Sequence, residues 1–280
     1  MNDFAVIILT HGRHDRVFTY DSLRKSGYTG KIYLLCDVDD KQLDLYKQKY
    51  KDEVLTFDKK DYIGKFDKMD NFGNMACVVY ARNAVYDVAK NIGLKYICVV
   101  DDDYTMYRYR IDKHQCYRTN LQIKNMDFVF NEYINFLKTS KIKTICFAQD
   151  GDFIGGFSNG KVKNGYIPYR KMMNLFFFDL DNTIDFVGTI NEDLTSSVVF
   201  GGKGDVILTC MMTSLLQKET QSNAGGLTDI YLELGTYVKS FYSVMAAPSC
   251  VKVAPMGDKS LRLHHAVTWK NAVPKIIREL

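Results

Sequence analysis

The stretch YICVVDDD, residues 96–103, decides the fold: an apolar run is followed at once by three adjacent aspartates. A continuous apolar run of this length is typical of a strand buried on both faces of a parallel sheet. In open α/β sheets, ligands bind at the carboxyl ends of the strands. The stretch therefore predicts a ligand site at the end of a central strand.

The residues before this stretch repeat a strand–helix unit. We expect strands at 4–9, 31–36 and 53–57, and helices at 15–26, 41–50 and 75–91. This alternation predicts an α/β fold, in which a mostly parallel twisted sheet carries helices on both faces. Beyond residue 125 the pattern is mixed. There we expect helices at 126–137, 193–199 and 206–217, and strands at 143–149, 175–180 and 237–244.

The composition bounds the class of protein. With 280 residues, 46% of them hydrophobic and only four of them proline, the chain is expected to form one globular domain, 1–280. It has no run of about 18 apolar residues and no signal-peptide pattern, so we expect neither a membrane span nor secretion. Seven scattered cysteines without a CxxC pair indicate reduced thiols in a cytoplasmic protein. The net charge of +4 permits an anionic partner without requiring one.

The three aspartates predict a metal site. Adjacent carboxylates repel one another, and a hard divalent ion such as Mg2+ or Mn2+ would offset that repulsion. In an extended backbone, Asp101 and Asp103 point to the same side and form the expected metal pair. The alternative is a solvated acidic turn or a helix N-cap.

A chain of strand–helix units that ends in an apolar strand and a D-x-D sequence resembles the GT-A glycosyltransferases, which use nucleotide sugars. The resemblance implies that residues 1–103 form the donor-binding half and residues 104–280 the acceptor-binding half. It also implies a set of donor contacts along the first half. They are Thr10, His11, Gly12, Arg13, Asp37, Arg82, Asn83, Asp101 and Asp102.

Five longer stretches resemble the TET-associated glycosyltransferases, a GT-A-type family found largely in bacteriophages. They are YARNAVYDVA (80–89), ICVVDDDY (97–104), INEDLTSS (190–197), GGLTDIYLELGTYVKSF (225–241) and LRLHHAVTW (261–269). This resemblance implies a UDP-sugar donor and a hydroxymethylated pyrimidine in DNA, such as 5-hydroxymethylcytosine, as the acceptor. It also implies the host cytoplasm as the location.

A second group of carboxylates, Asn191-Glu192-Asp193, precedes a predicted helix. One interpretation is a helix start, because Asn and acidic residues favour the first turn of a helix. The other is a general base that deprotonates the acceptor hydroxyl, as in inverting GT-A enzymes. We expect Asp193 to be the base, with Glu192 as the second candidate, and transfer with inversion. A carboxylate at a helix N-terminus is a weaker base, which argues against this role.

Three features in the second half have both a structural and a functional interpretation. His264 or His265 could complete the metal shell, or the pair could have no function, and Lys239 could neutralise the departing diphosphate. The polar loop 217–226 could be a lid or an ordinary connection. The basic, aromatic segment 161–171 could contact DNA or be a solvated loop.

Other classes of function stay open on the sequence alone. A GT-A enzyme could act on a saccharide, lipid or protein instead of DNA. A nucleotidyltransferase also uses carboxylates and Mg2+ on an α/β sheet, but THGRHDR (10–16) is only partly like its Gly-rich loop. A non-catalytic nucleotide- or DNA-binding module would not need the two groups of carboxylates.

Overall fold

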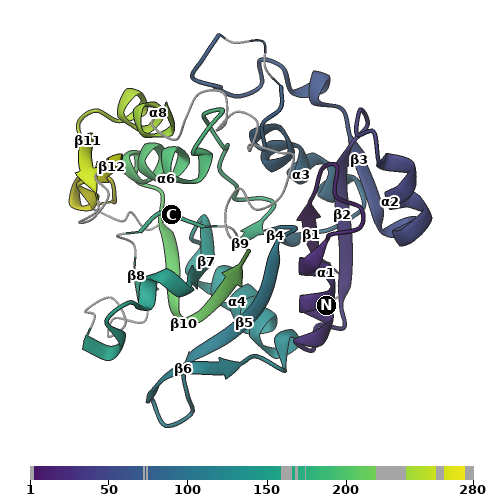
Figure 1. Ribbon diagram of the computed structural model, residues 1–280, viewed down its shortest axis with the longest axis horizontal. Helices are drawn as coiled ribbons and strands as arrows, with labels where there is room; N and C mark the ends of the chain where they lie inside the picture. The colour runs from purple at the N-terminus through teal and green to yellow at the C-terminus, as the bar shows by residue number, and fades with distance from the viewer. Residues whose placement is uncertain are drawn as a thin grey trace.

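The computed structural model describes residues 3–71, 73, 75–158, 166–167, 170–173, 175–218, 238–256 and 262–274. Within these ranges the centre of the molecule is a ten-stranded sheet (Figure 1). Its strands are β1 (Phe4–Leu9), β2 (Lys31–Asp37), β3 (Val54–Phe57), β4 (Tyr96–Asp101), β5 (Tyr104–Ile111), β6 (Tyr117–Gln122), β7 (Thr144–Gln149), β8 (Tyr166–Ile167), β9 (Leu175–Asp179) and β10 (Ile207–Gln217).

The order of the strands separates a parallel half from a mixed half. The sheet runs β3-β2-β1-β4-β9-β7-β10-β5-β6, with β8 paired to β10. The first four strands are parallel, β9 is antiparallel to both β4 and β7, and β5 is antiparallel to β10. The parallel half places the carboxyl ends of β1, β2 and β4 at one edge of the sheet.

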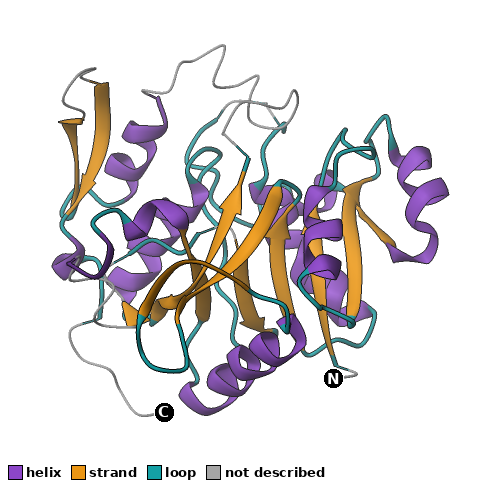
Figure 2. Cartoon of the chain, turned by 60° about the horizontal axis from the view of Figure 1, so that its bottom comes forward, coloured by secondary structure: helices purple, strands orange, loops and turns teal. Residues whose placement is uncertain are grey.

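Helices cover both faces of the sheet (Figure 2). The α-helices in the described ranges are α1 (Phe18–Lys25), α2 (Leu43–Tyr50), α3 (Val79–Asn91), α4 (Met126–Ser140), α6 (Glu192–Lys203) and α8 (Val238–Ala246), the last of which packs on α6. Alternate residues of the fully buried strand β1 enter two different cores: Phe4 packs in the core that holds α4 residues, and Ala5 in the core that holds α3 residues. The predicted α/β arrangement, with a mixed second half, is confirmed.

Two predicted elements in the second half were wrong. Residues 206–217 were expected to be helical but form strand β10, which pairs with β7 on one side and β5 on the other. The register of β10 against β7 shifts between Cys210 and Ser214, and this bulge breaks the alternation that marks a strand.

Residues 237–244 were expected to be a strand, but Val238–Ala246 is helix α8. Its buried face includes Ser240 and Ser243, which are three residues apart on one side of a helix. Because these buried residues are polar, the spacing of apolar residues alone did not indicate a helix. A two-stranded sheet of β11 (Val251–Met256) and β12 (Arg262–Val267) follows α8. No helix in the described ranges is both long and apolar enough to cross a membrane.

Candidate active site

The three aspartates lie at the carboxyl end of β4, as predicted, but not in one extended run. Strand β4 ends at Asp101, and Asp102 and Asp103 form the turn into β5. This turn gives each carboxylate different surroundings. The chemistry of the site therefore has to be worked out for each aspartate in turn.

The carboxylate of Asp102 is buried and joins β4 to the loop after β1. Thr10 donates its hydroxyl to Asp102 Oδ2 at 2.8 Å, and Arg13 Nη1 donates to Asp102 Oδ1 at 2.9 Å. Tyr46 of α2 bonds Thr10 Oγ1 at 2.7 Å and accepts the Arg13 backbone N–H at 2.8 Å. Burial raises the pKa of Asp102, and the Arg13 guanidinium opposes this rise. Asp102 thus holds the 10–13 loop in place.

The other predicted donor contacts near β1 and β2 are tied to protein groups as well. Gly12 has a φ of 65° and donates its backbone N–H to Asp40 at 2.8 Å, while His11 Nδ1 lies 3.3 Å from the same carboxylate. Asp37, at the end of β2, forms a buried ion pair of 2.6 Å with Lys59. These contacts fix the edge of the sheet beside the three aspartates.

Arg82 of α3 connects Asp101 to the second group of carboxylates. Its Nη2 donates to Asp101 Oδ1 at 2.6 Å, and its Nε lies 3.6 Å from Glu192 Oε1. The guanidinium is buried and stacks over Phe176 at 4.7 Å. Tyr104 adds a hydrogen bond of 3.2 Å to Asp101 Oδ2. Arg82 therefore joins Asp101 and Glu192 in one charge network, although Arg82 and Glu192 are 110 positions apart in the sequence.

Asn83, the neighbour of Arg82, has a different environment. Its amide donates to the carbonyls of Val79 and Phe186, and its Oδ1 accepts the Phe186 N–H at 2.8 Å. All three bonds go to the backbone. They tie the segment before the Asn191-Glu192-Asp193 group to α3.

Asp103 lacks an ion pair within the described part of the chain. Burial, together with repulsion from Asp101 and Asp102, raises the pKa of its carboxyl to about 7. This is the uncompensated negative charge that a bound cation would offset, and oxygen ligands suit Mg2+ and Mn2+. The residues present therefore fit a divalent ion held by Asp103 and the partly exposed Asp101.

The carboxylates of Glu192 and Asp193 begin α6 and differ in exposure. The Asp193 side chain is 16% exposed and the Glu192 side chain 8%. Lys171 donates to Asp193 Oδ2 at 2.6 Å, and the backbone N–H of Leu194 donates to its Oδ1 at 2.7 Å. Burial favours a higher pKa for Asp193, but the Lys171 ammonium outweighs it and the pKa of Asp193 is lowered. For Glu192, burial and the neighbouring Asp193 charge both raise the pKa. Asp193 is thus the ionised and more accessible of the two.

The two histidines lie at the start of α6 instead of joining the three aspartates. His265 Nδ1 is 3.5 Å from the Asn191 amide nitrogen, and the His264 and His265 rings are 4.0 Å apart. Burial, then the charges of His264 and Lys171, lower the pKa of His265 to about 3; Lys239 adds to this effect. Among the described residues, no three His, Cys, Asp or Glu side chains gather closely enough to hold a metal. The prediction that a histidine completes the metal shell stays a prediction, since the described residues do not bring His264 or His265 into a cluster with the three aspartates.

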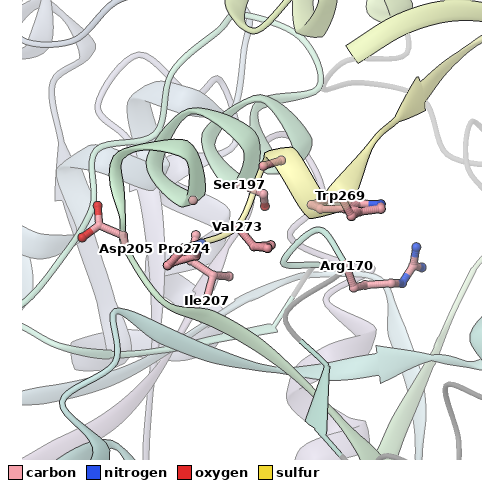
Figure 3. A pocket seen from close by; sticks show the side chains of 9 residues that line it. Arg170, Ser197, Asp205, Ile207, Trp269, Val273 and Pro274 are labelled. Atoms are coloured by element: carbon pink, nitrogen blue, oxygen red, sulfur yellow. The ribbon is translucent and has the colours of Figure 1, made fainter. Parts of the chain in front are cut away.

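A small pocket lies between α6, β10 and the segment after β12. Figure 3 shows Arg170 and Trp269 at one end of it and Asp205 at the other. Its lining consists of Arg170, Ser197, Gly201, Asp205, Ile207, Trp269, Ala272, Val273 and Pro274. None of the predicted site residues lines this pocket.

Sequence reasoning missed some of the residues that shape the site. Tyr46 carries no local signal, because its role depends on contacts with the distant residues Thr10 and Arg13. Tyr104 was not singled out, although it contacts Asp101 only three positions away. Lys171 was singled out only as part of the basic segment 161–171, and its contact with Asp193 was not predicted. Most of that segment and of the loop 217–226, including residues 161–165 and 219–226, lies outside the described residues.

The parallel sheet with carboxylates at the end of β4 and a carboxylate-bearing helix after an antiparallel strand is a GT-A-type fold, the fold of nucleotide-sugar glycosyltransferases. The chain belongs to the TET-Associated Glycosyltransferase family, whose model matches residues 4–226. Both resemblances inferred from the sequence are confirmed. A search of curated proteins gave no match.

Solved structures of similar fold include TarS from S. aureus in complex with UDP-GlcNAc, with a TM-score of 0.45 and 11% identity over 86% of this chain and 66% of that chain. The mannosyltransferase PcManGT from Pyrobaculum calidifontis, in complex with GDP-Man and Mn2+, has a TM-score of 0.42 and 9% identity over 88% of this chain and 74% of that one. The present chain thus spans just under two thirds of the TarS chain. Matches at this level say nothing about its own donor or acceptor.

Proposed function

We propose that this protein is a metal-dependent, inverting glycosyltransferase that transfers a sugar from a UDP-sugar to a 5-hydroxymethylated pyrimidine in DNA. Membership of the TET-Associated Glycosyltransferase family supports the reaction and the acceptor. The observation that carries the proposal is the line of charged groups from Asp103 through Asp101 and Arg82 to Glu192 and Asp193. This arrangement supports the proposal, because a cation held by the first two carboxylates would lie on the same charge network as a candidate base.

Asp101 and Asp103 are the residues that would hold Mn2+ or Mg2+. A bound divalent ion would offset the negative charge of the donor diphosphate. The loop 10–13 and Asp102 form the adjoining wall, which would meet the nucleotide. Arg82, locked between Asp101 and Glu192, fixes the position of the Asp101 carboxylate.

Asp193 is the base in this proposal. Its carboxylate would take the proton of the acceptor hydroxymethyl group as the acceptor oxygen forms a bond to the anomeric carbon. The bond from that carbon to the diphosphate oxygen breaks at the same time, and the electron pair leaves with UDP. Attack from the side opposite to the diphosphate inverts the configuration.

Glu192 has a structural part in the same mechanism. It is the more buried carboxylate and lies against Arg82, so it cannot meet an acceptor as readily as Asp193 can. A base in duplex DNA would have to leave the stack before its hydroxymethyl group could reach Asp193.

The test is UDP release with Mn2+ and a panel of UDP-sugars, in the presence of hydroxymethylcytosine-containing or unmodified DNA of the same sequence. We expect release that depends on the hydroxymethyl group, and proton NMR of the product should show a β-linkage from an α-configured donor. Asp193→Asn should lower kcat by about 100-fold or more. The matched control is Asp205→Asn, beyond the other end of α6, which should leave kcat unchanged. Equal release with unmodified DNA would contradict the acceptor, and an α-linkage would contradict inversion.

A further inference from the structure

The hairpin formed by β5 and β6 is a basic feature outside the candidate active site. It begins directly after Asp103 and forms the end of the sheet opposite to β3 (Figure 1). Residues 104–125 contain five Lys or Arg and one Asp, a formal charge of +4. Because the whole chain also has a net charge of +4, the remaining residues are neutral in sum. The hairpin and the turn that follows it are therefore basic, as is the segment 161–171, which contains four Lys or Arg and no acidic residue.

Part of this charge anchors the hairpin to the body of the protein. Arg108 and Arg110 both pair with Asp150, which follows β7. Arg110 Nε also donates to Ser214 Oγ of β10 at 2.8 Å, and Ser214 donates to Asp150 at 2.9 Å. Arg110 stacks over Phe153 at 4.4 Å. These contacts anchor β5 to β10 and to the segment that follows β7.

The rest of the charge faces solvent. Lys113 at the tip, Arg118 on β6 and Lys124 after β6 are all exposed, and the Arg118 side chain is 53% exposed. Five of the six residues of β6 are exposed, and most of them are polar. Strand β6 thus presents cationic and hydrogen-bonding side chains, without a core to cover.

The tip of the hairpin is held in one conformation. Asp112 Oδ1 accepts the backbone N–H groups of His114 and Cys116 at 2.9 and 3.0 Å. Its Oδ2 accepts Arg118 Nε at 2.7 Å. Asp112 therefore orients the Arg118 guanidinium, which reduces the loss of side-chain entropy when that group binds an anion.

The length of β5 can be compared with the spacing of nucleotides along a DNA strand. The eight residues of β5 extend for about 26 Å, at about 3.3 Å per residue, which matches seven or eight nucleotides at about 3.4 Å each. Because β5 also pairs with β10, β6 is the strand at the open edge of the sheet, where lysine and arginine side chains can neutralise DNA phosphates. Because β5 begins directly after Asp103, a duplex that lay along the hairpin would start beside the candidate active site.

We propose that the β5–β6 hairpin is the arm that grips the acceptor DNA, with Lys113, Arg118 and Lys124 on the phosphates. This inference rests on the proposed DNA acceptor. It adds the surface that holds the DNA while a base is presented at the end of β4.

The test compares two triple variants that remove the same charge. The arm variant is K113Q/R118Q/K124Q. The control is K31Q/K47Q/K90Q, whose three exposed lysines lie on β2, α2 and α3 at the other end of the sheet. Fluorescence anisotropy measures the affinity for a labelled 24-base-pair duplex from 50 to 200 mM NaCl. Three lost phosphate contacts should lower the slope of log K against log salt by about 2.7, and the arm variant should bind at least about tenfold more weakly at 100 mM salt. The control should keep the wild-type slope.

The outcomes separate this inference from the proposed function. If the arm variant keeps the wild-type slope and affinity, the hairpin does not bind DNA and the inference is wrong. The inference is also wrong if the arm variant loses transfer while its DNA binding is unchanged, a result that would indicate a protein partner. Binding of UDP should be equal in all three proteins. If the wild type binds DNA through the arm but transfers no sugar to hydroxymethylated DNA, the proposed function fails and the arm stands.

Discussion

Replacing Asp103 by Asn should remove a destabilising charge from the ion-free protein. Burial and two neighbouring carboxylates raise the pKa of Asp103 from 3.8 to about 7. A folded-state pKa above the unfolded value costs stability once the pH exceeds the unfolded value, and the full cost is present above the folded value. At about 1.36 kcal/mol per pH unit, the upper limit is about 4 kcal/mol. Because Asp103 is partly exposed, solvent screening reduces this to about 2 kcal/mol.

Thermal unfolding at pH 5 and pH 8, with and without Mn2+, measures this cost. A gain of about 2 kcal/mol corresponds to an increase in Tm of about 3 °C for a chain of this size. Without metal at pH 8, Asp103→Asn should melt about 3 °C above the wild type, and at pH 5 the difference should fall to about a third of that. Mn2+ should raise the Tm of the wild type at pH 8 and leave the variant unchanged.

The control and the refuting results are equally specific. Asp15→Asn removes a carboxylate that is 60% exposed and should leave the Tm unchanged at both pH values. If Asp103→Asn and the wild type have the same Tm at pH 8 without metal, the charge of Asp103 is already compensated in the folded protein. If Mn2+ stabilises the variant as much as the wild type, Asp103 is not a metal ligand.

Two further predictions concern α6. Lys171→Met removes the cation that lowers the pKa of Asp193, so the acid limb of the kcat/KM profile should move to higher pH. If the acid limb does not move, Lys171 does not control the pKa of the catalytic base. Gly201→Ala would place its Cβ 2.2 Å from the Ala272 carbonyl oxygen and should destabilise the protein by about 2–3 kcal/mol in urea unfolding. At Gly202 nothing lies within 4 Å, so Gly202→Ala should stabilise the helix by about 0.5–1 kcal/mol. Equal stability of the two variants would contradict the close packing at Gly201.

The sequence by itself determined the parallel half of the fold and the place of the three aspartates. The strands of this half are short apolar runs, and the helices between them have apolar residues at helical spacing. Both patterns are local, since each depends only on which side chains must leave water. The end of an apolar strand such as β4 therefore marks the ligand-binding edge before any contact is known.

Tertiary structure decided what each charged group does. Asp101, Asp102 and Asp103 are identical and adjacent in the sequence, yet the first pairs with Arg82, the second with Arg13, and the third has no ion pair in the described structure. Strand β10 likewise took its form from pairing with β5 and β7. Partners of this kind come from distant parts of the chain. Because burial and Coulomb interactions act through space and not along the sequence, only the folded arrangement sets the charge state and the role of each carboxylate.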